Sequence, residues 1–214
     1  MPRPEVNLIP EHTALVIVEC QGGTVGADSA LPDLAASAAP ALPVIARLAQ
    51  AARKAGARVV HLTYVPAFDG LSTNRVTPLQ QAIGPLNAGW TAERGGNVVD
   101  EIGVEPGDLV LQRSSGMSPT HSTELFAVLR NIGVRTVVLV GVSLNVAIPS
   151  ATVELGDEGF SVVIPRDGVA GTPPGQGRIS TSRARPRSHW AVVNGRSDRP
   201  GSTNTAPGSE RVRA

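Results

Sequence analysis

An unbroken apolar run near the start of the chain, Ala14-Leu-Val-Ile-Val18, restricts the fold more than any other feature of the sequence. A β-branched run of this kind, without polar alternation, is typical of a strand that is buried on both faces. Similar patterns predict strands over 13–19, 58–64, 108–112, 136–140 and 160–165, and helical spacing predicts helices over 42–55, 122–132 and 145–156. This alternation predicts an α/β domain with a doubly wound, mostly parallel sheet and helices on both faces.

Two segments between these elements have weaker patterns. Gly22, Gly23 and Gly26 indicate a loop after the first strand. Residues 66–106 are predicted to be rich in loops, with a short helix over 78–86.

The charge of the chain divides it into unequal parts. The net charge of +1 combines a balance of −5 over residues 1–170 with a balance of +6 over residues 171–214. The second part is rich in Gly, Ser, Thr, Pro and Arg and offers little apolar surface, a composition typical of disorder. We therefore predict an N-terminal lead over 1–12, an α/β domain over 13–170 and a disordered basic tail over 171–214.

The origin and partners of this tail have more than one interpretation. The abrupt change of composition after residue 171 is consistent with a change of reading frame in the gene, and a natural extension is the alternative. The eight arginines of the tail have no interleaved aromatic residues and form no known module, so no nucleic-acid partner is predicted.

The expected location of the protein follows from its cysteine content and its apolar runs. Cys20 is the only cysteine, so no intrachain disulfide can form. The sequence shows neither a secretion signal nor an apolar run of the roughly 18–20 residues that a membrane span needs. These features predict a cytoplasmic protein with no membrane partner.

Ligands of doubly wound sheets bind beyond the carboxyl ends of the strands. Three segments are expected there, namely 19–23, 112–115 and 141–148. Glu19 and Arg113 are the charged residues of these segments, and they form either part of a site or a buried ion pair kept for structure. Cys20 follows Glu19 and should point the opposite way, so a small buried hydrophobe is the expected role for it.

Three stretches in this order resemble the isochorismatase-like hydrolase superfamily, over about residues 12 to 170. They are Ala14-Leu-Val-Ile-Val-Glu-Cys-Gln21, Pro106-Gly-Asp-Leu-Val-Leu-Gln-Arg113 and the long stretch from Leu129 through Val140-Gly-Val-Ser-Leu-Asn-Val-Ala-Ile148 to Asp167. The resemblance implies a hydrolase with a triad of Asp, Lys and Cys. It also implies a cis peptide bond at Val142–Ser143. The resemblance further implies that the domain normally continues after its fifth strand through a helix, a sixth strand and a closing helix, so the C-terminal part of the domain is predicted to be missing or disordered here. A sheet without these elements exposes an edge and an apolar face, which predicts a homo-oligomer.

The residues at the positions of this triad differ from the usual ones. The aspartate position falls on Glu19, the lysine position on Arg113 and the cysteine position on Ala147. A methyl group cannot attack a substrate, so cysteine-dependent amidase activity is not expected. The resemblance also implies that substrate is bound by residues of the same loops, for which we predict Gln21, His121, Val142, Ser143 and Asn145.

Metal and cofactor sites are not predicted. His12, His61 and His121 have no metal-ligand spacing, and His61, in the middle of a strand, is expected to be a core residue. The glycine pairs near 168–177 lack the strand–turn–helix context of a dinucleotide loop.

Two functions therefore stay open, each with a small-molecule ligand. The first is an isochorismatase-like hydrolase that uses Glu19 as an acid or base, with Arg113 binding a carboxylate of the substrate. The second is a catalytically inactive protein that keeps the fold to bind a ligand or a partner.

Overall fold

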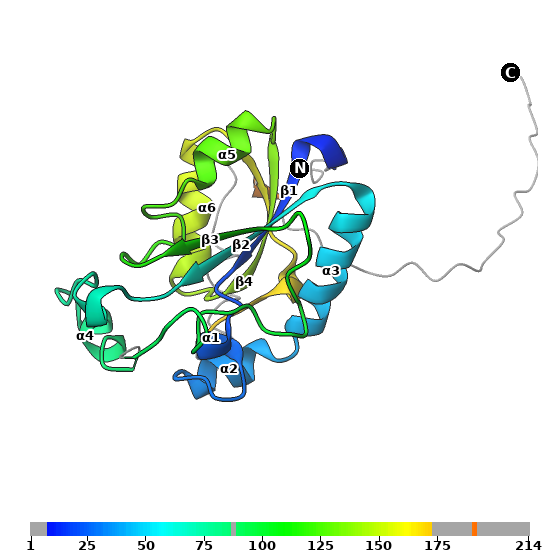
Figure 1. The fold of residues 1–214 in the computed structure, drawn as a ribbon. Coiled ribbons are helices and arrows are strands. Elements are labelled where there is room, and N and C mark those ends of the chain that lie inside the picture. The colour runs from blue at the N-terminus through cyan, green and yellow to red at the C-terminus, as the bar shows by residue number, and fades with distance from the viewer. Residues whose placement is uncertain (1–7, 87–88, 173–189, 192–214) are drawn as a thin grey trace, which may run out of the picture.

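The computed structural model describes residues 8–86, 89–172 and 190–191. In these residues a central sheet has helices on both faces, with α3 on one side and α5 and α6 on the other (Figure 1). The predicted doubly wound α/β fold is confirmed.

The sheet is parallel and reverses its winding direction near the middle. Its strands are β1 (Thr13–Val18), β2 (Arg58–Tyr64), β3 (Leu109–Arg113), β4 (Thr136–Val142), β5 (Ser161–Val163), β6 (Val169–Ala170) and β7 (Trp190–Ala191). They lie in the order β3-β2-β1-β4-β5-β7, with β6 beside β4, and all these pairings are parallel. Because β1 lies between β2 and β4, the winding reverses there, and this is where such sheets bind ligands.

Helices of very different length connect the strands. They are α1 (Gly22–Val25), α2 (Pro32–Ala38), α3 (Leu42–Ala55), α4 (Pro78–Ile83), α5 (Leu125–Asn131) and α6 (Ala147–Asp157), with short 3-10 turns at Pro10–His12, Phe68–Gly70 and Arg166–Gly168. The long helix α3 buries Ile45 and Ala49 against the sheet and ends at Gly56, whose φ of 80° suits a residue without a side chain.

The central strand β1 contributes side chains to two separate cores. All six of its residues are buried. Val16 and Val18 pack in a cluster that includes residues of α5 and α6, whereas Leu15 and Ile17 pack in a cluster with residues of α2 and α3. The continuous apolar run of the sequence is therefore explained by burial on both faces of the strand.

Two local predictions between β1 and α3 need correction. The glycine-rich segment predicted as a loop begins with the helical turn α1, and the helix α2 was not predicted. Polar contacts with a distant segment stabilise α1, because the backbone N–H groups of Gly22 and Gly23 donate to the carbonyls of Asn97 and Gly95. Sequence periodicity does not report contacts of this kind.

The C-terminal part differs from its prediction at one point. Residues 171–214 were predicted to be a tail without secondary structure, yet Trp190–Ala191 pairs in parallel with β5. The prediction is therefore wrong at these two residues. Residues 173–189 and 192–214, and residues 1–7 of the predicted N-terminal lead, lie outside the described residues.

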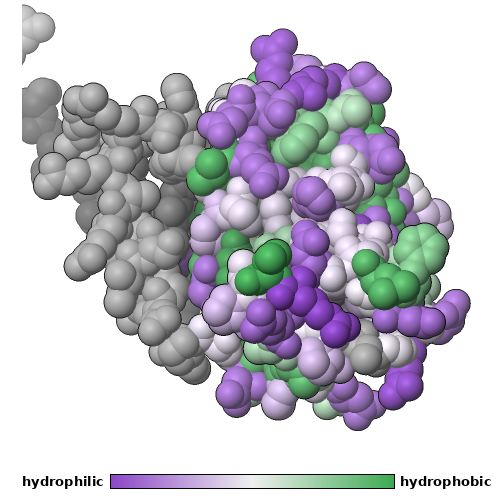
Figure 2. Space-filling view, turned by 90° about the vertical axis from the view of Figure 1, so that its left-hand side faces the viewer, coloured by the Kyte–Doolittle hydropathy of each residue, from purple (hydrophilic) through white to green (hydrophobic). Residues whose placement is uncertain are grey.

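The described surface exposes several large apolar side chains. Figure 2, seen from the side on which α4 lies in Figure 1, shows hydrophobic groups between hydrophilic ones. Three strongly exposed apolar residues follow β2, and these are Phe68, Leu71 and Val76. Among the described helices, none alone is long and apolar enough to cross a membrane, and only α2 and α3 taken together, with a 58° bend between them, meet the criterion.

Candidate functional site

A pocket of about 390 Å³ opens at the carboxyl edge of the sheet, where the winding reverses. The predicted residues Glu19, Arg113, Ser143, Asn145 and Ala147 all line it. Its other walls come from α2, from α4 and from residues near the ends of β2 and β3, and include Leu31, Leu34, Tyr64, Leu79, Ile83, Trp90 and Met117. The pocket is therefore lined by apolar side chains together with a smaller number of polar ones.

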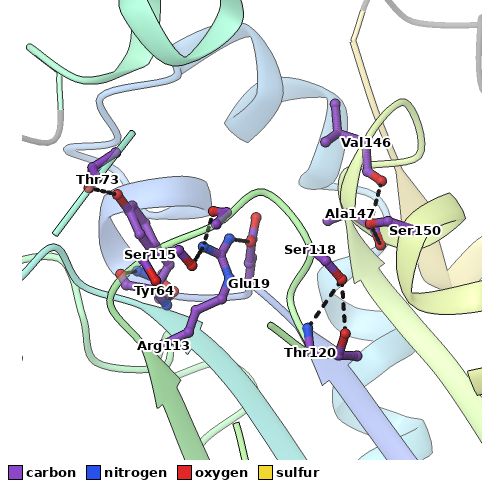
Figure 3. A network of polar contacts seen from close by, with 12 residues as sticks. Glu19, Tyr64, Thr73, Arg113, Ser115, Ser118, Thr120, Val146, Ala147 and Ser150 are labelled. Carbon is purple, nitrogen blue, oxygen red and sulfur yellow. Dashed lines mark hydrogen bonds and ion pairs between the residues drawn. The ribbon is translucent and has the colours of Figure 1, made fainter. Parts of the chain in front are cut away.

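Glu19 and Arg113 form an ion pair at the base of this pocket (Figure 3). Glu19 directly follows β1 with a φ of 51°, and its backbone N–H donates to the carbonyl of Leu62. Arg113 is the last residue of β3, and its Nη2 donates to Oε1 of Glu19. The Glu19 side chain is 16% exposed and the Arg113 side chain is 5% exposed, so the carboxylate is more accessible than the guanidinium.

The remaining contacts of Arg113 fix its guanidinium group. Its Nη1 donates to the carbonyls of Ser115, at 3.1 Å, and Gly116, at 2.7 Å. The ring of Tyr64 covers one face of the guanidinium, with 4.4 Å between the guanidinium carbon and the ring centroid. The Nε of Arg113 is buried without a hydrogen-bond partner among the described residues. Most of the donor capacity of this side chain is therefore used inside the protein.

Gln21 has a different place from the one predicted. It was expected to bind substrate, but its side chain is fully buried and does not line the pocket. Its Oε1 accepts from the backbone N–H of Tyr64 at 2.7 Å, and its Nε2 donates to the carbonyls of Tyr64 and Gly95. An amide offers one acceptor and two donors, and here all three roles are taken by backbone groups.

Ala147 opens α6 at the pocket and is buried. The loop before it contains a cis peptide bond at Val142–Ser143, which confirms that prediction. The N–H of Ile148 donates to the carbonyl of Ser143, whereas the N–H of Ala147 has no acceptor among the described residues. A free N–H at a helix start attracts partial negative charge.

Two other predicted substrate-binding residues are also absent from the pocket lining. Val142 is buried and packs in the core cluster that contains Leu15 and Ile17, because its side chain leaves β4 toward that face. His121 is exposed and lies against Gly116 in the loop after β3. Neither side chain is therefore in a position to contact a ligand in this pocket.

Cys20 is unsuited to nucleophilic chemistry. Its side chain is buried, and its thiol donates to the carbonyl of Val18. Burial, with a smaller effect from the charge of Glu19, raises the pKa of this thiol to about 12. A thiol is a weak nucleophile until it is ionised, so Cys20 behaves as the small buried hydrophobe that was predicted.

His61 is the core residue that its position in β2 predicts. Its Nε2 lies 3.2 Å from Oδ2 of Asp108, which also accepts from Nη2 of Arg53 at 2.6 Å and from the backbone N–H of Glu105 at 3.0 Å. Burial lowers the pKa of His61, against the opposing effect of the Asp108 hydrogen bond. This cluster lies at the start of β3, at the opposite end of the strand from Arg113.

Sequence reasoning missed the aromatic wall of the pocket. Tyr64 ends β2, and the rule that ligands meet the carboxyl ends of strands could have identified it. Trp90 meets Tyr64 edge to face, with 6.5 Å between ring centroids, and its ring lies against Gly23. A side chain at Gly23 would collide with this ring, since an added Cβ would come within 2.5 Å of it. No pattern in residues 66–106 indicates this contact.

Comparison with known proteins identifies the family. A model of the Isochorismatase domain matches residues 13–193. The chain belongs to the isochorismatase family. Ureidoacrylate amidohydrolase RutB of Enterobacter sp. (strain 638) is 29% identical over 168 residues, which are 69% of this chain and 71% of that protein. The crystal structure of a cysteine hydrolase from Pseudomonas syringae pv. phaseolicola 1448A superposes with a TM-score of 0.75 at 22% identity, over 90% of this chain and 93% of that one.

Zinc is present in one solved structure with the same fold. A pyrazinamidase of Pyrococcus horikoshii in complex with zinc superposes with a TM-score of 0.69 at 18% identity, over 86% of this chain and 99% of that one. Over 8–86 and 89–172, no group of three or more His, Cys, Asp or Glu residues could hold a metal ion. The pocket lining offers the carboxylates of Glu19 and Asp33 without a histidine. These donors do not fit a metal site, and no catalytic step is assigned to a metal.

Proposed function

We propose that this isochorismatase-family protein hydrolyses a C–N bond of a small amide or ureido compound by direct attack of water, with Glu19 as general base. The observation that carries the proposal is the state of the Glu19 carboxylate. Its Oε1 is paired with Arg113, its Oε2 has no hydrogen-bond partner among the described residues, and its side chain lines the pocket. The bond class is suggested by the ureidoacrylate amidohydrolases among the relatives of this chain.

The contacts of Glu19 suit a general base. The guanidinium of Arg113 donates to one carboxylate oxygen, and the other oxygen has no hydrogen-bond partner among the described residues. An ionised carboxylate can accept a proton, whereas the alternative role of general acid requires the protonated form. We therefore favour the base over the acid in the two roles that the sequence left open.

The proposed reaction has two proton transfers. Oε2 of Glu19 removes a proton from water while the water oxygen bonds to the carbonyl carbon of the substrate. The resulting tetrahedral intermediate breaks its C–N bond, and Glu19 returns the proton to the departing nitrogen. One water is consumed, and an acid and an amine are released.

The start of α6 would stabilise the negative oxygen of this intermediate. Ala147 contributes a backbone N–H without an internal acceptor, and an 11-residue helix adds its dipole at the same point. The methyl group of Ala147 leaves no nucleophile there, so the water must attack the substrate itself.

Arg113 orients the base in this proposal and does not bind a carboxylate of the substrate. Nη1 of Arg113 already donates to two carbonyls, and Nη2 donates to Glu19. A bidentate grip on a substrate carboxylate needs two free donors on one edge of the guanidinium. With Nε buried, no edge of the guanidinium offers two such donors, so Arg113 is proposed not to hold the substrate, in contrast to the expectation from the sequence.

Ligand binding without turnover is the second candidate. Ala147 favours it, because the position at which the family resemblance implies a cysteine nucleophile carries a methyl group. The two candidates share the pocket and differ in chemistry alone.

Turnover of small amides, ureido compounds and isochorismate, measured by product release across a range of pH, separates the candidates. The proposal predicts C–N cleavage that Glu19→Gln abolishes and that leaves the protein mass unchanged. Compounds that bind to the wild-type protein without turnover would establish the second candidate. Cleavage of isochorismate with no cleavage of amides would contradict the assigned bond class.

A further inference from the structure

The Glu19–Arg113 pair lies on an aromatic residue that holds both partners in place. The Tyr64 ring lies 4.4 Å from the guanidinium carbon of Arg113, and the Arg113 Nε has no other partner among the described residues. The carbonyls of Ser115 and Gly116 hold Nη1 and the Glu19 carboxylate holds Nη2, so the motion that these contacts restrain least is a tilt of the guanidinium plane about the line through the two nitrogens. Contact with the ring face is the interaction that sets this tilt.

Tyr64 is itself held at three points. Its backbone N–H and carbonyl are both bonded to the side chain of Gln21. Its hydroxyl lies 2.8 Å from Oγ1 of Thr73. The residue as a whole is only 8% exposed. A ring with so little freedom can serve as a rigid support.

Gln21 ties this support to the base. It lies two residues after Glu19, in the same turn that leaves β1. The backbone of Tyr64 is therefore fixed to the segment that carries Glu19, while its ring is in contact with the cation that pairs with Glu19. Tyr64 therefore contacts both the segment that carries Glu19 and the cation that pairs with Glu19.

We propose that Tyr64 is a positioning residue that acts on Glu19 through Arg113. The inference rests on the proposed role of Glu19 as general base. Without the ring, the guanidinium plane of Arg113 can tilt about the line through Nη1 and Nη2, and Glu19 loses the fixed direction of its Oε2. Proton transfer is sensitive to such displacements, because an error near 1 Å in a reacting group can reduce the rate by about 100-fold.

Three variants test the inference by kinetics. Tyr64→Leu removes the ring, Tyr64→Phe keeps the ring and removes only the hydroxyl, and Phe160→Leu makes the same ring-to-Leu change in the core away from the pocket. We expect Tyr64→Leu to lower kcat at least about tenfold, with a smaller change in KM. Tyr64→Phe should restore most of this loss, and Phe160→Leu should lower stability and leave kcat unchanged. An equal loss of kcat in Tyr64→Leu and Phe160→Leu would overturn the inference.

Crystal structures of the two Tyr64 variants decide the question independently of activity. The inference predicts that the guanidinium of Arg113 keeps its contact with Glu19 in Tyr64→Phe and changes its tilt in Tyr64→Leu. An unchanged Glu19–Arg113 pair in Tyr64→Leu would overturn it, even if the protein hydrolyses no substrate. A changed tilt without any turnover would support the positioning role and contradict the proposed hydrolysis.

Discussion

The two ends of β3 each carry a buried arginine–carboxylate pair, and the pairs differ in how completely they are satisfied. Before the strand, both oxygens of Asp108 accept hydrogen bonds, from Arg53, from His61 and from the backbone of Glu105. At its end, Glu19 uses one oxygen for Arg113 and leaves the other without a partner among the described residues. The Arg53–Asp108 pair does not line the pocket, whereas the Glu19–Arg113 pair faces its cavity of about 390 Å³.

Under the proposed mechanism, this difference distinguishes the structural Arg53–Asp108 pair from the functional Glu19–Arg113 pair. A carboxylate whose oxygens are all bonded inside the protein cannot accept a proton from water without breaking those bonds. A carboxylate with one bonded and one free oxygen is oriented and still available. The sequence left open that Glu19 and Arg113 form a purely structural pair. The fully bonded Asp108 has the contacts expected of such a pair, whereas Glu19 does not.

The largest expected effect is on catalysis. Glu19→Gln keeps an oxygen that can accept from Arg113 and removes the base. We expect kcat to fall by about 100-fold or more, as is usual for loss of general base catalysis, and the unfolding free energy to fall by up to about 3 kcal/mol, because the buried Arg113 loses its counter-charge. Steady-state kinetics and urea unfolding of the same preparation measure both quantities. A large loss of stability with a normal kcat would show that the Glu19–Arg113 pair is structural and would contradict its proposed catalytic role.

The next effect is on stability at the other end of β3. Asp108→Asn leaves Arg53 and His61 with only part of their hydrogen bonding at a site where the Asp108 side chain is 4% exposed. We expect the unfolding free energy to fall by about 3 kcal/mol, with kcat of the folded protein unchanged. Glu105→Gln is the matched control, because that side chain is 58% exposed and should contribute less than about 1 kcal/mol. Equal effects of the two substitutions would contradict the structural role of Asp108.

A smaller effect concerns acid stability. Burial lowers the pKa of His61 below its ordinary value of 6.5, so the unfolded chain binds a proton there before the folded chain does. Stability from this site is complete above pH 6.5 and is lost as the pH falls through that value toward the folded-state pKa. Burial alone would raise the pKa of Asp108, but hydrogen bonds from Arg53, the Glu105 backbone and His61 lower it below 3.8, so its contribution is lost only in stronger acid.

Melting temperatures of the wild type and of His61→Asn between pH 8 and pH 5 check this sign. The wild type should lose stability toward the acid end of the range, and His61→Asn should show a flatter curve. A steeper curve in the variant would mean that the imidazole is protonated in the folded protein.

The smallest expected effect comes from restoring the missing thiol. Ala147→Cys places a thiol at the start of α6 and leaves Glu19 and Arg113 in place of the usual aspartate and lysine. The longer carboxylate and the non-titrating cation should keep thiol-dependent amidase activity close to background. Amidase assays of this variant, with Ala151→Cys on the same helix as a control for the added thiol, measure the effect. Strong amidase activity from Ala147→Cys alone would show that one substitution separates this chain from a thiol enzyme.

The sequence predicted the location of a residue correctly where the residue directly follows or ends a predicted strand. Glu19 and Arg113 were placed at the carboxyl ends of strands in one parallel sheet, and there they form an ion pair across the intervening strand β2. The approach failed for Gln21, whose amide bonds to the backbone of Tyr64, because a side chain that satisfies buried backbone groups has no signature in sequence spacing. It also missed Trp90, since the loops that place this ring follow no periodic pattern.

The central claim is that water attacks the substrate directly, with Glu19 as base and no covalent intermediate. Repeated turnover in heavy-oxygen water, followed by mass spectrometry of both the product and the peptide that contains Glu19, tests this claim most directly. The account predicts label in the product and none in the peptide. Label in the Glu19 carboxylate, or an adduct on Cys20, would mean that a side chain of the protein attacks the substrate and would contradict the account.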